Sequence, residues 1–275
     1  MTVRAVGLVP HPNREAAAEL ARHATVRLAG HGIDVRSPGH PAAELDAAGL
    51  DVVISLGGDG TMLRAVDLAY EAGVPVLGVN VGQMGYLTEV EPGDFDSALD
   101  RLVSGDYEVA ERMVLEITVE SAGPAQGRWF ALNEAVLEKV HTGRLARLEV
   151  VINGTFFTTY AADGVIVATP TGSTAYSFSA RGPIVSPRHR CLLLTPVSPH
   201  MLFDRSLVLA AEETLRFVVC DDRSVVLTAD GRELGELAAG DAVSCRGGTL
   251  PARIVTLGPR DFHQILKAKF GLSDR

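Results

Sequence analysis

The sequence predicts an α/β N-terminal domain, with a parallel sheet and flanking helices, followed by a β-rich C-terminal domain. Up to about residue 110, short runs of Val, Ile and Leu alternate with segments whose apolar residues recur at helical spacing. This alternation is typical of a parallel sheet that is covered on both faces. Beyond Glu111, β-branched segments are separated by turn signals such as Asn153-Gly154 and Asp230-Gly231, which favour antiparallel strands.

The N-terminal elements are expected in β-α-β order, with Asn13 as a candidate N-cap of the first helix and Gly30 and Gly105 as stop signals. The expected elements are, in order, a strand at 3–9, a helix from about Asn13 to Ala29, a strand at 52–56, a helix at 61–72, a strand at 74–79 and a helix at 94–103. Ligands of such sheets bind at the carboxyl ends of the strands. A site is therefore expected just after residue 56.

In the C-terminal part, representative strands are expected at 114–120, 145–152 and 215–219. Pro259 interrupts the chain, and Asp261 to Lys269 has the pattern of a short helix. The expected domains are residues 1–110, residues 111–258, and residues 259–275 as a helix that packs back on the first domain.

Composition excludes several classes of function. The 275 residues carry a net charge of −9, which argues against a broad nucleic-acid or anionic-membrane surface, since both need a surplus of Lys and Arg. The three cysteines are widely spaced and form no C-x-x-C pair, so we expect neither a zinc site nor a redox pair. Because no export signal or apolar run of ~20 residues is recognisable, we expect a cytoplasmic protein.

The segment Gly57–Thr61, with the sequence GGDGT, lies between an expected buried strand and a helix. Glycines let a polyphosphate approach backbone N–H groups closely, and a helix N-terminus favours negative charge. A carboxylate at such a place is understandable if Asp59 accepts a proton from an attacking hydroxyl or orients Mg²⁺. The alternative is a strand-to-helix turn in which Asp59 only caps the helix. The sequence contains no G-x-x-x-x-G-K-[ST] motif, which excludes a P-loop.

Hydroxyl residues cluster after another expected strand, in the segment TPTGSTAYSFSA at 169–180. The hydroxyls and N–H groups around Gly172 would suit the base, sugar and pyrophosphate of a nucleotide, and Tyr176 could pack on a ring. The alternative is a Ser/Thr-rich turn that caps a helix starting near Ser173.

Asn133 and Glu134 are adjacent within a strand-like run at 129–140. Neighbouring strand residues point to opposite faces, so both reach one ligand only if a turn or bulge intervenes. From the local sequence alone we interpret Glu134 as a solvated strand residue.

Taken together, these motifs resemble the ordered signature of the NAD kinase family. They are, in chain order, GGDGT at 57–61, N-x-G-x-x-G-Y-L at 80–87, Asn-Glu at 133–134, Asp-Gly at 163–164, TPTGSTAYSFSA at 169–180, Ser-Pro-His at 198–200 and Asp-Gly at 230–231. Diacylglycerol kinases and phosphofructokinases share forms of GGDGT but lack TPTGSTAY. The resemblance spans roughly residues 50–260 and implies a kinase that phosphorylates the adenosine-ribose 2′-hydroxyl of NAD to give NADP.

The resemblance implies that Asp59 is the general base for that hydroxyl. It assigns donor-phosphate binding to Gly57, Gly58, Gly60 and Thr61. Three arginines are candidate cations for the phosphates, or equally surface residues: Arg64, Arg144 and Arg147. The implied donor is ATP or inorganic polyphosphate, and the small Ala161 before the Asp-Gly strand favours the broader range. Mg²⁺ or another divalent cation is expected through the donor phosphates, without protein metal ligands of its own.

For NAD, the resemblance implies contacts from Tyr86, Asn133, Glu134, Asp163, Thr171, Thr174, Ala175, Tyr176, Ser179 and Asp230. Members of the family assemble as dimers or tetramers, so a homodimer or homotetramer is expected. Arg181-Gly182 stands where the family usually has Gly-Gly, and a bulky cation there could touch a phosphate or narrow the pocket. Two alternatives therefore stay open: the same fold acting on another nucleotide or nucleoside, and a catalytically silent nucleotide sensor.

Overall fold

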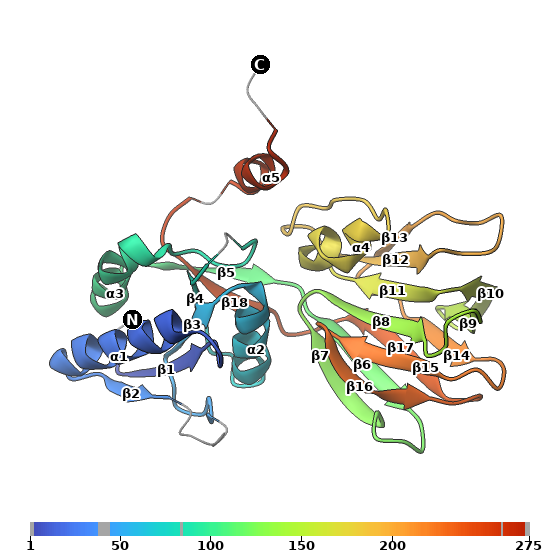
Figure 1. The fold of residues 1–275 in the computed structure, drawn as a ribbon, viewed down its shortest axis with the longest axis horizontal. Coiled ribbons are helices and arrows are strands. Elements are labelled where there is room, and N and C mark those ends of the chain that lie inside the picture. The colour runs from blue at the N-terminus through green and yellow to red at the C-terminus, as the bar shows by residue number, and fades with distance from the viewer. Residues whose placement is uncertain (1–2, 38–44, 83–84, 260, 273–275) are drawn as a thin grey trace. The chain divides into compact units, whose positions relative to one another are not determined.

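In the computed structural model, residues 3–37, 45–82, 85–259 and 261–272 are described. The chain forms two compact units. One consists of the residues up to Glu111 together with those from Ala252 onward, and the other is Arg112–Pro251. Blue, cyan and dark red mark most of the first unit in Figure 1, and green to orange mark the second.

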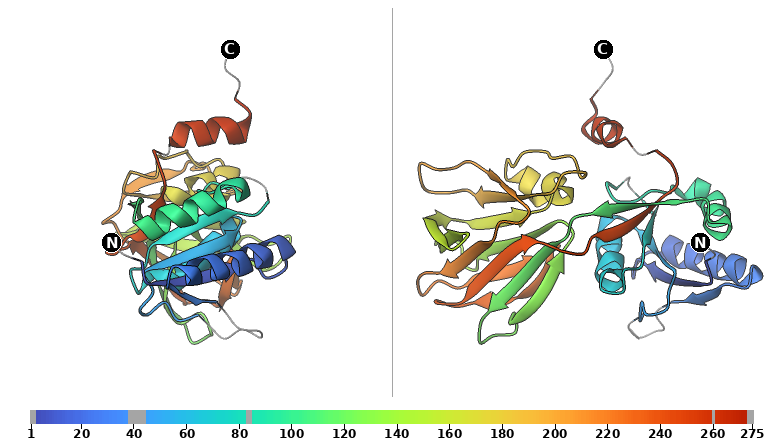
Figure 2. Two further views of the ribbon diagram at one scale, coloured as in Figure 1. Left: turned by 90° about the vertical axis from the view of Figure 1, so that its left-hand side faces the viewer. Right: turned by 180° about the vertical axis from the view of Figure 1, so that it is seen from behind.

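The first unit is built on a six-stranded sheet in the order β2-β1-β3-β4-β18-β5. Its strands are β1 (Ala5–Pro10), β2 (Asp34–Arg36), β3 (Val52–Gly57), β4 (Val76–Asn80), β5 (Glu108–Arg112) and β18 (Ala252–Thr256). Its helices are α1 (Glu15–Gly30), α2 (Asp59–Tyr70), the 3₁₀ helix η1 (Pro92–Asp94), α3 (Phe95–Ser104) and α5 (Phe262–Phe270). The pairs β1–β2, β1–β3, β3–β4 and β4–β18 are parallel, which confirms the expected parallel sheet with flanking helices (Figure 2).

The apolar pattern of α1 determines which face it buries. Its buried residues recur every three or four positions and are Ala17, Ala21, Ala24 and Leu28. The expected cap was wrong, because the N-cap is Arg14 and it makes no side-chain cap hydrogen bond. Asn13 lies one residue too early, and its backbone N–H instead donates to Nδ1 of His11 at 3.2 Å.

The chain returns to the first sheet earlier than the sequence suggested. We had assigned residues 252–258 to the second domain, but β18 pairs in parallel with β4, with Ile254 opposite Val76. The five residues of β18 are as apolar and β-branched as the strands of the neighbouring antiparallel sheets. Local sequence therefore could not indicate which sheet they join.

The second unit contains two six-stranded sheets, in the orders β10-β9-β14-β17-β6-β7 and β13-β12-β11-β8-β15-β16. The first has β6 (Leu115–Glu120), β7 (Gly127–Ala131), β9 (Ala146–Ile152), β10 (Thr155–Ala162), β14 (Leu215–Val219) and β17 (Ala242–Gly247). The second has β8 (Glu134–Lys139), β11 (Gly164–Ala168), β12 (Cys191–Val197), β13 (Leu207–Ala210), β15 (Val225–Ala229) and β16 (Arg232–Leu237). Neighbouring strands pair antiparallel, as in β9–β10 and β8–β15, which confirms the β-rich expectation.

The two sheets of this unit share one hydrophobic core. Buried side chains from both sheets, including Ile117 and Phe217 on one and Leu137 and Leu192 on the other, belong to the same cluster. The opposite face of the second sheet is covered too, because Tyr176 and Val185 pack against Ile166 of β11 and its neighbours. This cover is made by the short elements η2 (Thr171–Thr174) and α4 (Tyr176–Ser179) and the segment after them.

The two expected tight turns are present. Asn153-Gly154 joins β9 to β10 with φ values of 51° and 79°, and Asp230-Gly231 joins β15 to β16 with φ values of 49° and 76°. Two successive positive φ values are the backbone of a type I′ turn, whose twist matches that of the strands. The second turn also places the Asp230 side chain within the candidate site.

The C-terminal helix α5 has Asp261 as its N-cap, and the Asp261 side chain accepts a hydrogen bond from the backbone N–H of His263 at 2.9 Å. Its Lys269 ammonium lies 4.2 Å from the ring centroid of Tyr86 in the same unit, close enough for a cation–π interaction. None of its residues is buried. Within the described ranges, no helix combines the length and apolar character that crossing a membrane requires.

Replacing Leu28 with Ala is expected to lower the free energy of unfolding by about 2–5 kcal/mol, because truncating a fully buried side chain leaves a cavity. Leu28 is 0% exposed, whereas Val26 on the same helix is 76% exposed. Val26→Ala is the matched control and should change stability by less than about 0.5 kcal/mol. Urea denaturation followed by circular dichroism measures both, and equal losses in the two variants would contradict this burial pattern.

Candidate functional site

The GGDGT segment forms the turn from β3 into α2. β3 ends at Gly57, Gly58 is the N-cap with φ −99° and ψ −166°, and α2 begins at Asp59. The helix therefore starts two residues earlier than expected, and Asp59 lies in its first turn. The first N–H groups of a helix lack intrahelical acceptors and carry a partial positive charge. This turn has the geometry of an anion site at the carboxyl end of a parallel strand.

The carboxylate of Asp59 does not cap α2. Its Oδ2 accepts the backbone N–H of Tyr86 and its Oδ1 that of Leu87, both at 2.9 Å. The alternative in which Asp59 serves only as a helix cap is therefore wrong. Each carboxylate oxygen has two acceptor positions, so two hydrogen bonds leave capacity to accept a proton from a bound hydroxyl.

Gly85 is required by this arrangement. A Cβ added there would lie 2.2 Å from Oδ1 of Asp59 and 2.9 Å from Oγ1 of Thr88, closer than side chains tolerate. The N-x-G-x-x-G-Y-L motif thus brings a backbone segment directly against the carboxylate. This contact was not apparent from the sequence, which gave no reason to link residues 85–87 with Asp59.

The glycines of GGDGT differ in what requires them. A Cβ at Gly57 would lie 2.2 Å from Oγ1 of the buried Thr61, so protein packing demands glycine there. A Cβ at Gly58 or Gly60 would meet no atom within 4 Å. Packing within the first unit therefore does not explain glycine at positions 58 and 60, and both border open space beside the α2 N-terminus.

Two further candidates lie in the first unit. The Tyr86 side chain is half-buried, and burial followed by the charge of Asp59 raises the pKa of its hydroxyl. Arg64 is exposed on α2, one turn beyond the GGDGT segment.

In the second unit, Asp230 organises the break between β7 and β8. Its carboxylate accepts the backbone N–H of Leu132 at 2.7 Å, of Asn133 at 2.8 Å and of Glu134 at 3.1 Å. The backbone N–H of Asp230 donates in return to the Glu134 carbonyl at 3.0 Å. The run at 129–140 is consequently two strands with a turn at residues 132–133. Such a turn is what Asn133 and Glu134 need in order to reach one ligand together.

The hydroxyl-rich segment at 169–180 is hydrogen-bonded to this turn. Thr169 donates its hydroxyl to the Leu132 carbonyl at 2.6 Å and its N–H to the Asn133 carbonyl at 2.8 Å. A Cβ at Gly172 would lie 2.2 Å from the Asn133 carbonyl oxygen, so only glycine fits. The Asn133 side-chain amide has no hydrogen-bond partner among the residues that the structure describes, and it is half-exposed.

Glu134 is 7% exposed, so our local interpretation of a solvated residue was wrong. Burial and the nearby charge of Asp230 raise the pKa of its carboxyl to about 8, against a smaller opposing effect of the Tyr176 backbone N–H. Its Oε2 is buried without a hydrogen-bond partner in the described chain. At neutral pH the side chain is therefore predominantly a neutral acid that can donate a hydrogen bond.

Two candidates, Tyr176 and Asp163, are held in place by residues that sequence reasoning missed, Glu138 and Lys139. Tyr176 donates its hydroxyl to Oε1 of Glu138 at 2.7 Å, and Asp163 forms an ion pair with the Lys139 ammonium. Burial, assisted by Glu138, raises the pKa of Tyr176 to about 12, so it remains a hydroxyl donor. Glu138 comes close to these residues because the register of β8 with β11 places it opposite Gly164. This register cannot be read from the sequence alone.

The remaining candidates lie on η2 and α4. The N-cap residues of the two elements make no side-chain cap hydrogen bond, but the hydroxyl of Thr169 accepts the backbone N–H of Gly172 in η2 at 3.2 Å. The segment is therefore in part the hydroxyl-containing turn of the alternative interpretation. The Thr174 hydroxyl donates to the Thr171 carbonyl at 3.4 Å. Ala175 is the residue between η2 and α4, and Ser179 is exposed at the end of α4.

Arg181 occupies a backbone conformation that favours glycine. Its φ is 65° and its side chain is exposed, which explains physically why glycine is usual at this position in the family. Packing requires glycine at the next residue, because a Cβ at Gly182 would lie 2.2 Å from Oγ of Ser177.

Replacing Glu134 with Gln is expected to flatten the pH dependence of stability. The folded-state pKa of about 8 lies above the ordinary value of 4.5, so the folded protein binds this proton more tightly. The stabilisation is complete below the unfolded pKa and is lost as the pH rises through about 8.

Urea denaturation of the wild type should therefore show stability falling between about pH 5 and pH 8, with a smaller fall in Glu134→Gln. Glu233→Gln, at an exposed position of β16, should retain the wild-type profile. An identical pH profile for wild type and Glu134→Gln would refute the buried neutral carboxyl.

Known proteins share both the sequence and the fold. The family models for the ATP-NAD kinase N-terminal and C-terminal domains match residues 36–107 and 132–257. An NAD kinase of Heliobacterium modesticaldum is 41% identical, over 96% of this chain and 97% of its own. An NAD kinase 2 of Streptomyces avermitilis is 40% identical, over 98% of this chain and 95% of its own.

Two solved structures are similar over nearly the whole chain. An NAD kinase from Archaeoglobus fulgidus in complex with ATP has a TM-score of 0.77 at 26% identity, covering 98% of this chain and 100% of that one. Yeast NADH kinase complexed with NADH has a TM-score of 0.84 at 24% identity, covering 100% of this chain and 90% of that one, and bears on the fold alone. From these matches, and from the motifs that led to them, the chain belongs to the NAD kinase family.

Proposed function

We propose that this kinase, which phosphorylates NAD to NADP with ATP, uses Asp59 as the general base for the adenosine-ribose 2′-hydroxyl. The observation that carries the proposal is the carboxylate of Asp59 in the first turn of α2. Backbone N–H groups hold it in place, and it lies next to open space at Gly58 and Gly60. A base must be held rigidly and keep an acceptor position for the proton.

The donor phosphates bind, in this proposal, over Gly58 and Gly60. Without side chains there, phosphate oxygens can approach the backbone N–H groups of the α2 N-terminus. Thr61 is buried against Gly57, so we infer that it shapes the turn and that its backbone contributes to binding. Arg64, exposed on the same helix, adds a positive charge for the outer phosphates.

At the nucleotide end, the proposed contacts are polar but largely neutral. Asn133 offers a side-chain amide that has no hydrogen-bond partner within the described ranges, and Glu134 offers a buried acid that is protonated near neutral pH. Tyr176 and Asp163, held by Glu138 and Lys139, supply further hydrogen bonds. Asp230 acts here by positioning Asn133 and Glu134, since its carboxylate already accepts three N–H groups. Tyr86, Thr171, Thr174, Ala175 and Ser179 complete the proposed set.

A divalent cation such as Mg²⁺ fits this arrangement when it is bound mainly by the donor phosphates. Within the described ranges, no three His, Cys, Asp or Glu side chains converge as a metal site. Asp59, with free acceptor positions beside the phosphate turn, is the protein group that could orient such an ion. When bound, the cation would neutralise charge on the transferred phosphoryl group.

The proposal extends to donor range and assembly. The small Ala161, at the end of β10, supports use of inorganic polyphosphate beside ATP. Phe156 and Leu202, 60% and 106% exposed, are apolar surface residues of the second unit that would suit a subunit contact in a homodimer or homotetramer.

Asp59→Asn should abolish most turnover while NAD binding persists. Loss of a positioned base costs typically ~10²–10⁴-fold in rate, and asparagine can still accept one of the two N–H groups. NADP formation is measured with NAD, Mg²⁺ and either ATP or polyphosphate, beside NAD binding by calorimetry. Substantial turnover in the variant would remove Asp59 as base, and a wild type that binds NAD without forming NADP would favour a sensor.

Gly60→Ala should fold normally yet raise the KM for ATP by about tenfold or more, because a methyl group blocks the approach of phosphate to the backbone. Gly30→Ala, where a Cβ also meets no atom within 4 Å, is the control and should leave the KM unchanged. Gly57→Ala should instead lower thermal stability through its clash with Thr61. An unchanged KM in Gly60→Ala would show that the donor lies elsewhere.

A further inference from the structure

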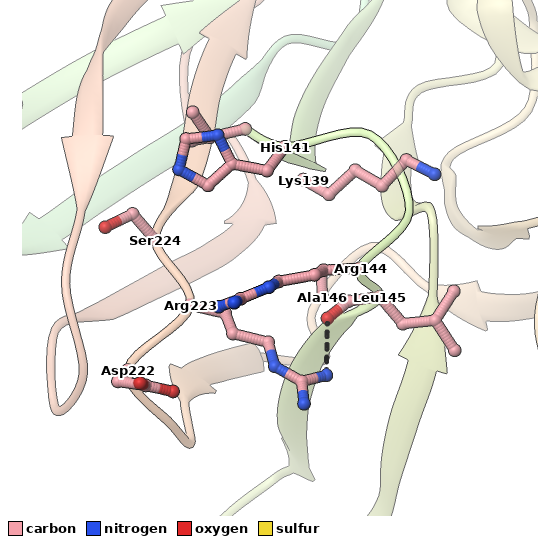
Figure 3. Close-up of a pocket in the computed structure, with 9 residues that line it drawn as sticks. Lys139, His141, Arg144, Leu145, Ala146, Asp222, Arg223 and Ser224 are labelled. Carbon is pink, nitrogen blue, oxygen red and sulfur yellow. Dashed lines mark hydrogen bonds between the residues drawn. The ribbon is translucent and has the colours of Figure 1, made fainter.

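A small pocket lined by two arginines lies in the second unit, and one of them, Arg144, is among the candidate phosphate cations named from the sequence. It has a volume of about 100 Å³ and is formed where the β8–β9 connection meets the β14–β15 connection (Figure 3). Pockets for drug-sized ligands are typically about 300–1,000 Å³. This volume therefore suits a small ion or a single group of a larger ligand, and excludes a whole nucleotide.

Two arginines dominate the pocket. Figure 3 shows the Arg144 side chain extending across it, with Arg223 below. Arg223 is held in place, because Nη1 donates to the Leu145 carbonyl at 3.4 Å and Nε lies 3.5 Å from a carboxylate oxygen of Asp221. Arg144 is exposed and has no hydrogen bond or ion pair among the described residues. One guanidinium is thus fixed, and the other has all its donors available.

The other polar groups of the lining favour an anion. His141 and Ser224 add an imidazole and a hydroxyl, and Asp222 is the one carboxylate among the lining residues. The stem of Lys139 forms part of the wall, but its ammonium is paired with Asp163 and points away from the pocket in Figure 3. Asp221, just outside the lining, already pairs with Arg223. The cation of the pocket that is left without an ion pair among the described residues is therefore Arg144.

We propose that this pocket binds a phosphate group, with Arg144 and Arg223 as its principal ligands and His141 and Ser224 as further hydrogen-bonding groups. Guanidinium groups present paired N–H donors that match a tetrahedral oxyanion, and such charge-assisted bonds are the strong ones. An anion also offsets the mutual repulsion of the two guanidiniums. The phosphate is either free inorganic phosphate or one phosphate of a nucleotide bound to the same unit, since Lys139 joins the pocket wall to Asp163.

The test is calorimetric titration of the full-length protein with inorganic phosphate at constant ionic strength. The wild type should bind saturably, and Arg144→Gln should weaken binding by about tenfold or more. Arg188→Gln removes the same charge from an exposed position of the segment between α4 and β12, outside the pocket lining, and should bind as the wild type does. Arg223→Gln should also weaken binding, with thermal stability measured for each variant.

Repeating the titration with saturating NAD distinguishes the two sources. Persistent binding identifies free phosphate as the occupant, whereas displacement by NAD identifies the pocket as a subsite for a nucleotide phosphate. No saturable binding, equal affinity in wild type and Arg144→Gln, or equal weakening by Arg144→Gln and Arg188→Gln would overturn the proposal. These readouts measure binding alone, so they stand apart from the proposed role of Asp59.

Discussion

The organisation of the proposed nucleotide site depends on one interaction, that of the Asp230 carboxylate with three consecutive backbone N–H groups. These bonds break the strand between β7 and β8 at residues 132–133. Without the break, Asn133 and Glu134 would point to opposite faces of one strand. The turn also supplies the carbonyls that fasten Thr169, and through the close contact at Gly172 it fixes the start of η2. A single side chain on a hairpin thereby positions two distant segments.

In the first unit, the carboxylate of Asp59 likewise accepts backbone N–H groups, but with a different consequence. Its oxygens fix the backbone of Tyr86 and Leu87, and Gly85 permits the close approach. Asp230 accepts three backbone N–H groups, whereas Asp59 accepts two and borders open space. Two carboxylates with similar backbone partners are thus suited to different tasks, one to positioning and one to accepting a proton. The difference lies in remaining acceptor capacity and access, which sequence motifs do not reveal.

The sequence predicted the fold class, the two tight turns and the strand-to-helix position of GGDGT, because apolar periodicity and glycine-containing turns are local signals. It failed where partners are distant in the chain. The sheet to which β18 belongs, the burial of Glu134 and the pairing of Lys139 with Asp163 all depend on strand order, which no local pattern encodes. The N-cap of α1 is one residue later than expected, and α2 begins two residues earlier.

An acidic chain that handles polyanions must avoid placing its own charge against them. At the proposed donor site, backbone N–H groups and glycines without side chains serve this purpose. Asp59 is the one carboxylate of the GGDGT segment. At the nucleotide end, burial converts Glu134 into a neutral donor, and Lys139 neutralises Asp163. Each of these three acidic groups is thus protonated, paired or proposed to accept a proton. This local compensation reconciles a net charge of −9 with a reaction between two anions, without requiring a basic surface.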